Sequence, residues 1–158
     1  MLPNGEDGVD KKIKISMDLG ISQNEEWKEE DQALFNALSQ GLGAYFDFCR
    51  AHHQMVPVFS SGIKDNGYQI QRTRPGEFYA WHHDFCIDSG FGARILTYIW
   101  YLNDVNEDGY TEFIDGTRIQ PETGKLMLFP ATWTYSHRGF PPKSETKYIC
   151  TGWVYSGE

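Results

Sequence analysis

The chain has 158 residues and a formal net charge of −8, a length that suits one domain built around one sizeable core. Hydrophobic residues make up 40% of the sequence and aromatic residues 15%, which excludes an intrinsically disordered protein. The acidic balance argues against a nucleic-acid partner, and the most apolar stretch, residues 95–102, is far shorter than the roughly 18 residues that would predict a membrane span.

The first predicted elements are a short strand and a long helix. Residues 12–16 alternate in polarity and predict the strand. Ser22-Gln23-Asn24-Glu25 has the capping-box pattern that opens helices. The pattern predicts a helix over about 25–52, within a supporting segment of about 22–53, and its apolar stripe needs a sheet to pack against. The stripe comprises Trp27, Leu34, Leu38, Leu42, Tyr45 and Phe46.

Short strands and turns are predicted for the rest of the chain. Asp115-Gly116 is a two-residue hairpin signal between two of the strands. Seven or eight strands after one helix predict a mainly β fold, a double-stranded β-helix (jelly roll) with its core at about 66–156, in a single domain that spans 1–158. The strands expected from patterning are 68–73, 94–102, 110–113, 117–120, 125–129 and 147–155.

His82, Asp84 and His137 predict a metal site. On a strand, His82 and Asp84 would point the same way, while His83 would point away. The His-x-Asp pattern alone is common, but a distal histidine followed ten residues later by Lys147 makes the set more specific. Two imidazoles and one carboxylate leave one face of a metal open, which is typical of non-heme Fe(II) oxygenases, although zinc accepts the same ligands.

Several segments in order resemble the Fe(II)- and 2-oxoglutarate-dependent dioxygenases, specifically the prolyl 4-hydroxylase-like group, over roughly residues 66–156. They look like the family's Tyr-x-x-His-x-Asp-Phe strand, its strand ending in Tyr-Leu-Asn, its Gly-x-Thr-x-Phe element, the strand before the distal histidine, and the final strand with a basic residue, threonine and tryptophan. In this chain the segments are 79–85, 96–103, 109–113, 125–130 and 147–153. Many relatives carry a tyrosine that contacts the cosubstrate near residue 73 or 74, where this chain has Thr73-Arg74.

The resemblance implies an oxidoreductase that holds Fe(II) with His82, Asp84 and His137. It implies 2-oxoglutarate and O2 as cosubstrates, with conversion of 2-oxoglutarate to succinate and CO2 and hydroxylation of a C–H bond, and an ascorbate-type reductant for the iron. The far carboxylate of 2-oxoglutarate is expected to reach Lys147. The other residues expected to bind the cosubstrate are Tyr101, Thr151 and Tyr79.

The substrate is not defined by the sequence. Trp153, Trp81 and Arg74 are candidates for substrate contacts, and packing or solubility is the alternative explanation for each. Peptidyl proline, free amino acids and other small molecules all stay open. Two other functions are also weighed: a non-catalytic jelly-roll module that keeps its metal for structure, and a cupin-type metal enzyme, in which Lys147 would have no clear role.

The cysteine content predicts a reducing, cytoplasmic setting. Cys49, Cys86 and Cys150 are few and odd in number, unlike a disulfide framework. No basic-then-apolar leader opens the sequence, which fits the same expectation. Cys86 is expected to be a small buried side chain.

Overall fold

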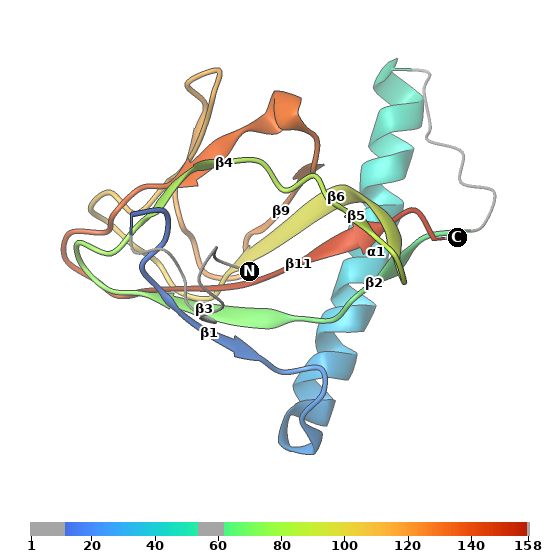
Figure 1. Cartoon of the computed structure of the whole chain (residues 1–158), viewed down its shortest axis with the longest axis horizontal. Coiled ribbons are helices and arrows are strands. Elements are labelled where there is room, and N and C mark those ends of the chain that lie inside the picture. The colour runs from blue at the N-terminus through green and yellow to red at the C-terminus, as the bar shows by residue number, and fades with distance from the viewer. Residues whose placement is uncertain (1–11, 54–61, 158) are drawn as a thin grey trace.

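The computed structural model describes residues 12–53 and 62–157. A seven-stranded sheet and a four-stranded sheet lie opposite one another as the two walls of an open barrel (Figure 1). This arrangement, with one long helix beside it, confirms the predicted mainly β jelly roll with helical support. None of the described helices has the length and apolarity that crossing a bilayer would require.

The large sheet has the strand order β1-β3-β11-β6-β5, with β2 added beside β11 and β9 beside β6. The small sheet has the order β4-β10-β7-β8. All strand pairs are antiparallel, including β11 with β3 and with β6. The strands are β1 Met17–Gly20, β2 Lys64–Asp65, β3 Gln69–Thr73, β4 Tyr79–His82, β5 Ile87–Asp88, β6 Gly92–Tyr101, β7 Thr111–Phe113, β8 Arg118–Ile119, β9 Leu126–Pro130, β10 His137–Gly139 and β11 Lys147–Tyr155.

Helix α1 (Lys28–His53) follows a 3-10 turn, η1 (Glu25–Trp27), so the predicted helix is confirmed. Its cap differs from the capping box. Asn24 accepts a hydrogen bond from the Glu26 N–H at 3.0 Å, whereas Ser22 accepts one from the N–H of Tyr68 at 2.7 Å. Ser22 therefore ties the chain before the helix to the start of β3.

The apolar stripe of α1 packs on the face of the large sheet that lies away from the small sheet. Leu38 is buried against a cluster that includes Tyr98, Trp100 and Cys150, and Leu34 and Leu42 flank it. Along β11, Cys150 and Val154 enter this core, because successive side chains of a strand alternate. The residues of β11 that face the interior of the barrel are Lys147, Ile149, Thr151 and Trp153. The same strand thus serves the hydrophobic core and the barrel interior.

The structure corrects the predicted strand at 12–16. The ladder with β3 begins at Met17, which pairs with Arg72. Beyond β3 the chain turns, and the N–H of Glu77 bonds the carbonyl of Arg74 at 2.9 Å. Residues before Met17 therefore have no strand of the large sheet to pair with, and Lys14 forms only an isolated bridge with Tyr79 of β4.

Two smaller predictions are also corrected. The β7–β8 hairpin forms, but its loop has three residues, because Phe113 and Thr117 are hydrogen-bonded across it. Cys86 is exposed and not buried, because it lies in the irregular segment between β4 and β5 and not within a paired strand.

Gly152 occupies a position on β11 where no side chain fits. The Tyr98 hydroxyl, fully buried, donates a hydrogen bond to the carbonyl of Gly67 at 2.8 Å directly above it. A Cβ atom at Gly152 would lie 2.1 Å from that hydroxyl and 2.6 Å from the Gly67 carbonyl oxygen. A residue larger than glycine at position 152 would therefore displace the Tyr98 hydroxyl from its hydrogen bond to Gly67.

We expect Gly152→Ala to lower the free energy of unfolding by about 1–3 kcal/mol through overpacking. The matched control is Gly43→Ala in α1, where an added Cβ meets nothing within 4 Å and the change should stabilise by about 0.5–1 kcal/mol. Chemical denaturation of both variants measures the two effects. Equal stability of the two proteins would contradict the packing described for Gly152.

Candidate metal centre and binding pocket

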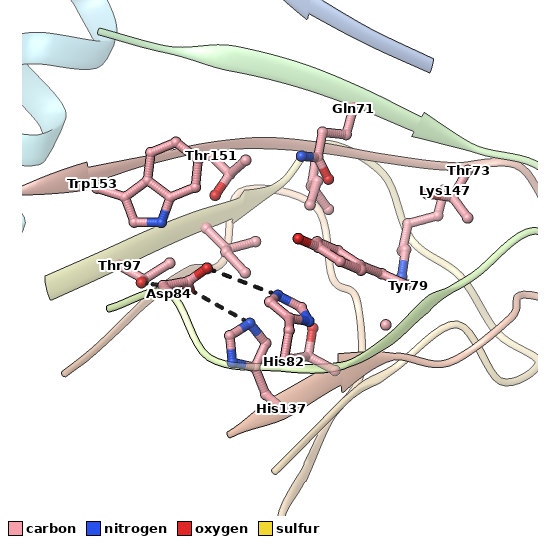
Figure 2. A pocket seen from close by; sticks show the side chains of 14 residues that line it. Gln71, Thr73, Tyr79, His82, Asp84, Thr97, His137, Lys147, Thr151 and Trp153 are labelled. Atoms are coloured by element: carbon pink, nitrogen blue, oxygen red, sulfur yellow. Dashed lines mark hydrogen bonds and ion pairs between the residues drawn. The ribbon is translucent and has the colours of Figure 1, made fainter. Parts of the chain in front are cut away.

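The three predicted metal ligands meet inside the barrel (Figure 2). His82 ends β4 and His137 begins β10, and these residues are directly paired across the two strands. The sequence predicted that Asp84 lies on the same strand as His82. In the structure Asp84 lies two residues beyond the end of that strand. Its carboxylate oxygens are 3.8 Å from Nε2 of His82 and 3.6 Å from Nε2 of His137. His83, as expected, is exposed.

Backbone carbonyl groups fix the tautomer of both histidines. Nδ1 of His82 lies 2.8 Å from the carbonyl oxygen of Ala80, and Nδ1 of His137 lies 3.0 Å from that of Tyr135. A carbonyl oxygen only accepts hydrogen bonds, so each Nδ1 must carry the proton. Each Nε2 is then left with a lone pair that faces Asp84 and is available to a metal.

The surroundings of His82 keep it uncharged at neutral pH. Burial, and then the neighbouring His137 ring, lower the pKa of His82 to about 4. The ring of Tyr79 stacks on it with centroids 3.6 Å apart and an angle of 12° between the planes. Burial likewise raises the pKa of Tyr79, with Asp84 contributing to the shift, so the phenol keeps its proton.

Asp84 is held in place by residues of β6. It is buried, and the hydroxyl of Thr97 donates a hydrogen bond to its Oδ2 at 2.7 Å. Arg94 is 3.5 Å from the backbone carbonyl of Asp84 and stacks over the ring of Trp153 at 3.8 Å. Such partners orient a metal-binding carboxylate without binding the metal themselves. The donor set of two imidazoles and one carboxylate, open on one side, fits a catalytic Fe(II) ion.

Lys147 is a buried cation in the same pocket. Only 4% of its surface is exposed, and Nζ donates a hydrogen bond to the carbonyl of Gly109 at 2.9 Å. Across residues 12–53 and 62–157, no carboxylate forms an ion pair with it. Burial lowers the pKa of Lys147 to about 8. A buried cation without a carboxylate partner is poised to bind an anion that enters the pocket.

Of the other residues predicted to bind the cosubstrate, two line the pocket and one lies behind it. Tyr79 and Thr151 line the pocket, whereas Tyr101 does not. The Tyr101 hydroxyl is fully buried behind Thr111 and lies 2.7 Å from its hydroxyl oxygen, so Thr111, and not Tyr101, meets the pocket. Thr151 donates to the carbonyl of Tyr98 at 2.9 Å. It also lies about 13 Å along β11 from Lys147, toward the other end of the pocket.

Of the three residues predicted to contact the substrate, one lines the pocket and two lie outside it. Trp153 lines the pocket, and its Nε1 is buried without a hydrogen-bond partner. Trp81 lies outside the pocket, is 44% exposed, and packs beneath the guanidinium of Arg138 at 4.9 Å. Arg74 is an exposed turn residue whose N–H bonds the side chain of Glu77 at 2.7 Å. The outward position of the Trp81 side chain follows from strand alternation, because Trp81 is next to His82, which points into the barrel.

Sequence reasoning missed much of the pocket wall. The missed residues come from the inner faces of β3, β6 and β11 in the large sheet and of β7 and β10 in the small sheet. Buried polar side chains at alternate positions of β3 were the available signal, because an apolar core would hold aliphatic residues there. These missed residues are Gln71, Thr73, Thr97, Ile99, Thr111, Gly139 and Ile149.

The model of the 2OG-Fe(II) oxygenase superfamily matches residues 68–155. The chain belongs to this superfamily. Members use Fe(II) and 2-oxoglutarate, which accounts for an open triad beside a buried lysine. A putative prolyl 4-hydroxylase of Acanthamoeba polyphaga mimivirus is 30% identical over 166 residues, covering 92% of this chain and 60% of the relative. The chain thus spans less than two thirds of the length of that curated relative.

Solved structures of prolyl hydroxylases share the fold of this chain. The viral collagen prolyl hydroxylase of Paramecium Bursaria Chlorella virus-1, in its 2-oxoglutarate complex, has a TM-score of 0.68 at 20% identity, covering 90% of this chain and 79% of that one. A Trichoplax adhaerens prolyl hydroxylase bound to a hypoxia inducible factor oxygen degradation domain peptide fragment has a TM-score of 0.65 at 19% identity, covering 94% and 66%. These likenesses support the double-stranded β-helix.

We expect Thr97→Val to weaken metal binding by about tenfold, because Asp84 loses the hydroxyl that orients its carboxylate. Thr97→Ser keeps that hydroxyl and is the matched control, expected to bind metal like the unaltered protein. Competition of each protein with a chromophoric chelator for Mn(II) gives the dissociation constants. If the valine variant binds Mn(II) as tightly as the unaltered protein, Thr97 does not orient Asp84 for metal binding.

Proposed function

We propose that this protein is an Fe(II)- and 2-oxoglutarate-dependent dioxygenase of the prolyl hydroxylase type, which hydroxylates a C–H bond and converts 2-oxoglutarate to succinate and CO2. The observation that carries the proposal is the position of Lys147. It is a buried, unpaired cation facing the same pocket as a metal triad with an open side. A dicarboxylate that chelates a metal at one end and pairs with an amine at the other fits both ends of this pocket.

The charges of the site support a dicarboxylate ligand. Two charged protein groups line the pocket with the neutral histidines: the carboxylate of Asp84 and the ammonium group of Lys147. A divalent metal would leave a net charge of two positive units in a buried site. A ligand with two carboxylates neutralises it, which favours binding because isolated buried charges are costly.

Each protein group has a proposed role in this reaction. His82, Asp84 and His137 hold the metal through two lone pairs and a carboxylate, and leave its opposite side free. Bound Fe(II) would supply the activation of O2 that couples cosubstrate oxidation to hydroxylation. Lys147 positions the far carboxylate, and Tyr79 covers His82 and excludes water from that side of the site.

For the substrate we propose a prolyl-containing peptide. A similar fold from Trichoplax adhaerens was solved with a peptide fragment, and the metal end of this pocket offers Trp153, whose buried Nε1 has a free donor. The guanidinium of Arg94 stacks on the same ring. A cytoplasmic location and an ascorbate-type reductant stay predictions from the sequence. A structural metal module or a cupin-type enzyme would not use a buried lysine in this position.

We expect anaerobic addition of 2-oxoglutarate to the Fe(II) protein to produce a weak visible charge-transfer band. His137→Ala should abolish the band, because a ligand to the metal is lost. Lys147→Ala should raise the 2-oxoglutarate concentration needed by at least about tenfold, because a charge-assisted contact is typically worth about 1.5–3 kcal/mol. Iron binding by the unaltered protein without any band would favour the non-catalytic module.

The affinity for 2-oxoglutarate should fall as the pH rises through about 8. The pKa of Lys147 is lowered to about 8 by burial, so its amine is charged below that pH and neutral above it. Between pH 7 and pH 9 the dissociation constant should rise about tenfold. Lys147→Arg stays charged over this range, so its profile should be flat, and a flat profile for the unaltered protein would contradict the role given to Lys147.

A further inference from the structure

Gln71 is a buried residue whose carboxamide is open to the pocket and has no partner among the described residues. Gln71 is 9% exposed and lines the same cavity as the metal triad and Lys147. Figure 2 shows its side chain turned from β3 into the pocket. Throughout the described ranges, no hydrogen bond joins its side chain to another residue. The carboxamide therefore keeps two N–H donors and one acceptor for whatever occupies the cavity.

An unpartnered carboxamide in such a place needs an explanation in terms of binding. Polar groups buried by folding are nearly always hydrogen-bonded, because losing their contacts with water is unfavourable. A leucine would fill the same wall without that disadvantage. Since the protein offers Gln71 no partner, the hydrogen bonds that make this residue favourable must come from the contents of the pocket.

Strand register places Gln71 between the two ends of the pocket. On β11, Lys147 pairs with Thr73 of β3, and the next inward-facing residue, Ile149, pairs with Gln71. Inward residues on a strand are about 6.6 Å apart. Gln71 is thus one step from the row of Lys147, on the way toward Thr151 and the metal end. A ligand that reaches from the metal to Lys147 passes beside it.

The chemistry of the carboxamide suits a dicarboxylate. A metal dication, Asp84, Lys147 and a dianionic ligand sum to zero charge, so a further cation or anion beside them would unbalance the site. Gln71 adds donors with no charge. We propose that Gln71 is a cosubstrate-binding residue, whose N–H donates a hydrogen bond to a carboxylate oxygen of 2-oxoglutarate. This inference rests on the proposed function, and it assigns Gln71 to that ligand and not to the hydroxylated substrate.

The test is calorimetric titration of the Mn(II)-loaded protein with 2-oxoglutarate, which needs no turnover. Gln71→Leu should weaken binding by about tenfold or more, as expected for a lost hydrogen bond to a charged group. Gln71→Glu should weaken it further, because it brings a negative charge beside a dianion. The matched control is Gln69→Leu, two residues earlier on the same face of β3, where the side chain lines a neighbouring cavity; its dissociation constant should equal that of the unaltered protein.

Two further measurements distinguish a binding role of Gln71 from a structural one. The Mn(II) affinity of Gln71→Leu should be unchanged, and the thermal midpoint of the ligand-free protein should not fall, because no internal hydrogen bond is lost. A lower midpoint with unchanged 2-oxoglutarate affinity would overturn the inference and leave the proposed function standing. If the unaltered protein binds Mn(II) but not 2-oxoglutarate, the proposed function itself fails, and Gln71 has no cosubstrate to bind.

Discussion

The antiparallel pairing of β4 with β10 is the constraint on which the site depends. It sets His82 opposite His137, although 55 positions separate them in the sequence, and it does so on the inner face of the small sheet. Carbonyl groups within two residues of each histidine then select the tautomer, so the same backbone that positions the rings also prepares their lone pairs. Asp84, two residues beyond the end of β4, completes the set, and the hydroxyl of Thr97 on the large sheet holds its carboxylate.

The large sheet supplies the other half of the site by alternation. Three adjacent strands contribute inward side chains that form a wall from Lys147 to Trp153. Lys147 at one end and the two histidines at the other are held by separate sheets, so the distance between them is set by the barrel. A rigid separation of this kind selects ligands by length as well as by charge.

Much of this could be predicted from sequence because the strongest signals were local or periodic. The triad and Lys147 stood out by residue type and spacing, and β11 was placed with its observed bounds. The predicted strand at 12–16 failed because these residues lack a continuing neighbour in the large sheet. Tyr101 shares a face with pocket residues, and the structure places its hydroxyl behind Thr111. Gln71 was not predicted as a pocket residue, because a glutamine in a strand ordinarily indicates a side chain that faces solvent.

The two faces of β11 have a consequence for how this pocket can change over evolution. Cys150 and Val154 complete the packing beneath α1, and the odd positions from Lys147 to Trp153 line the pocket. Inserting or deleting one residue within the strand would exchange the two sets, placing a lysine in the apolar core and Cys150 before the metal. New ligand preferences can therefore arise here through replacement of single side chains, while changes in length are confined to the loops around the barrel mouth.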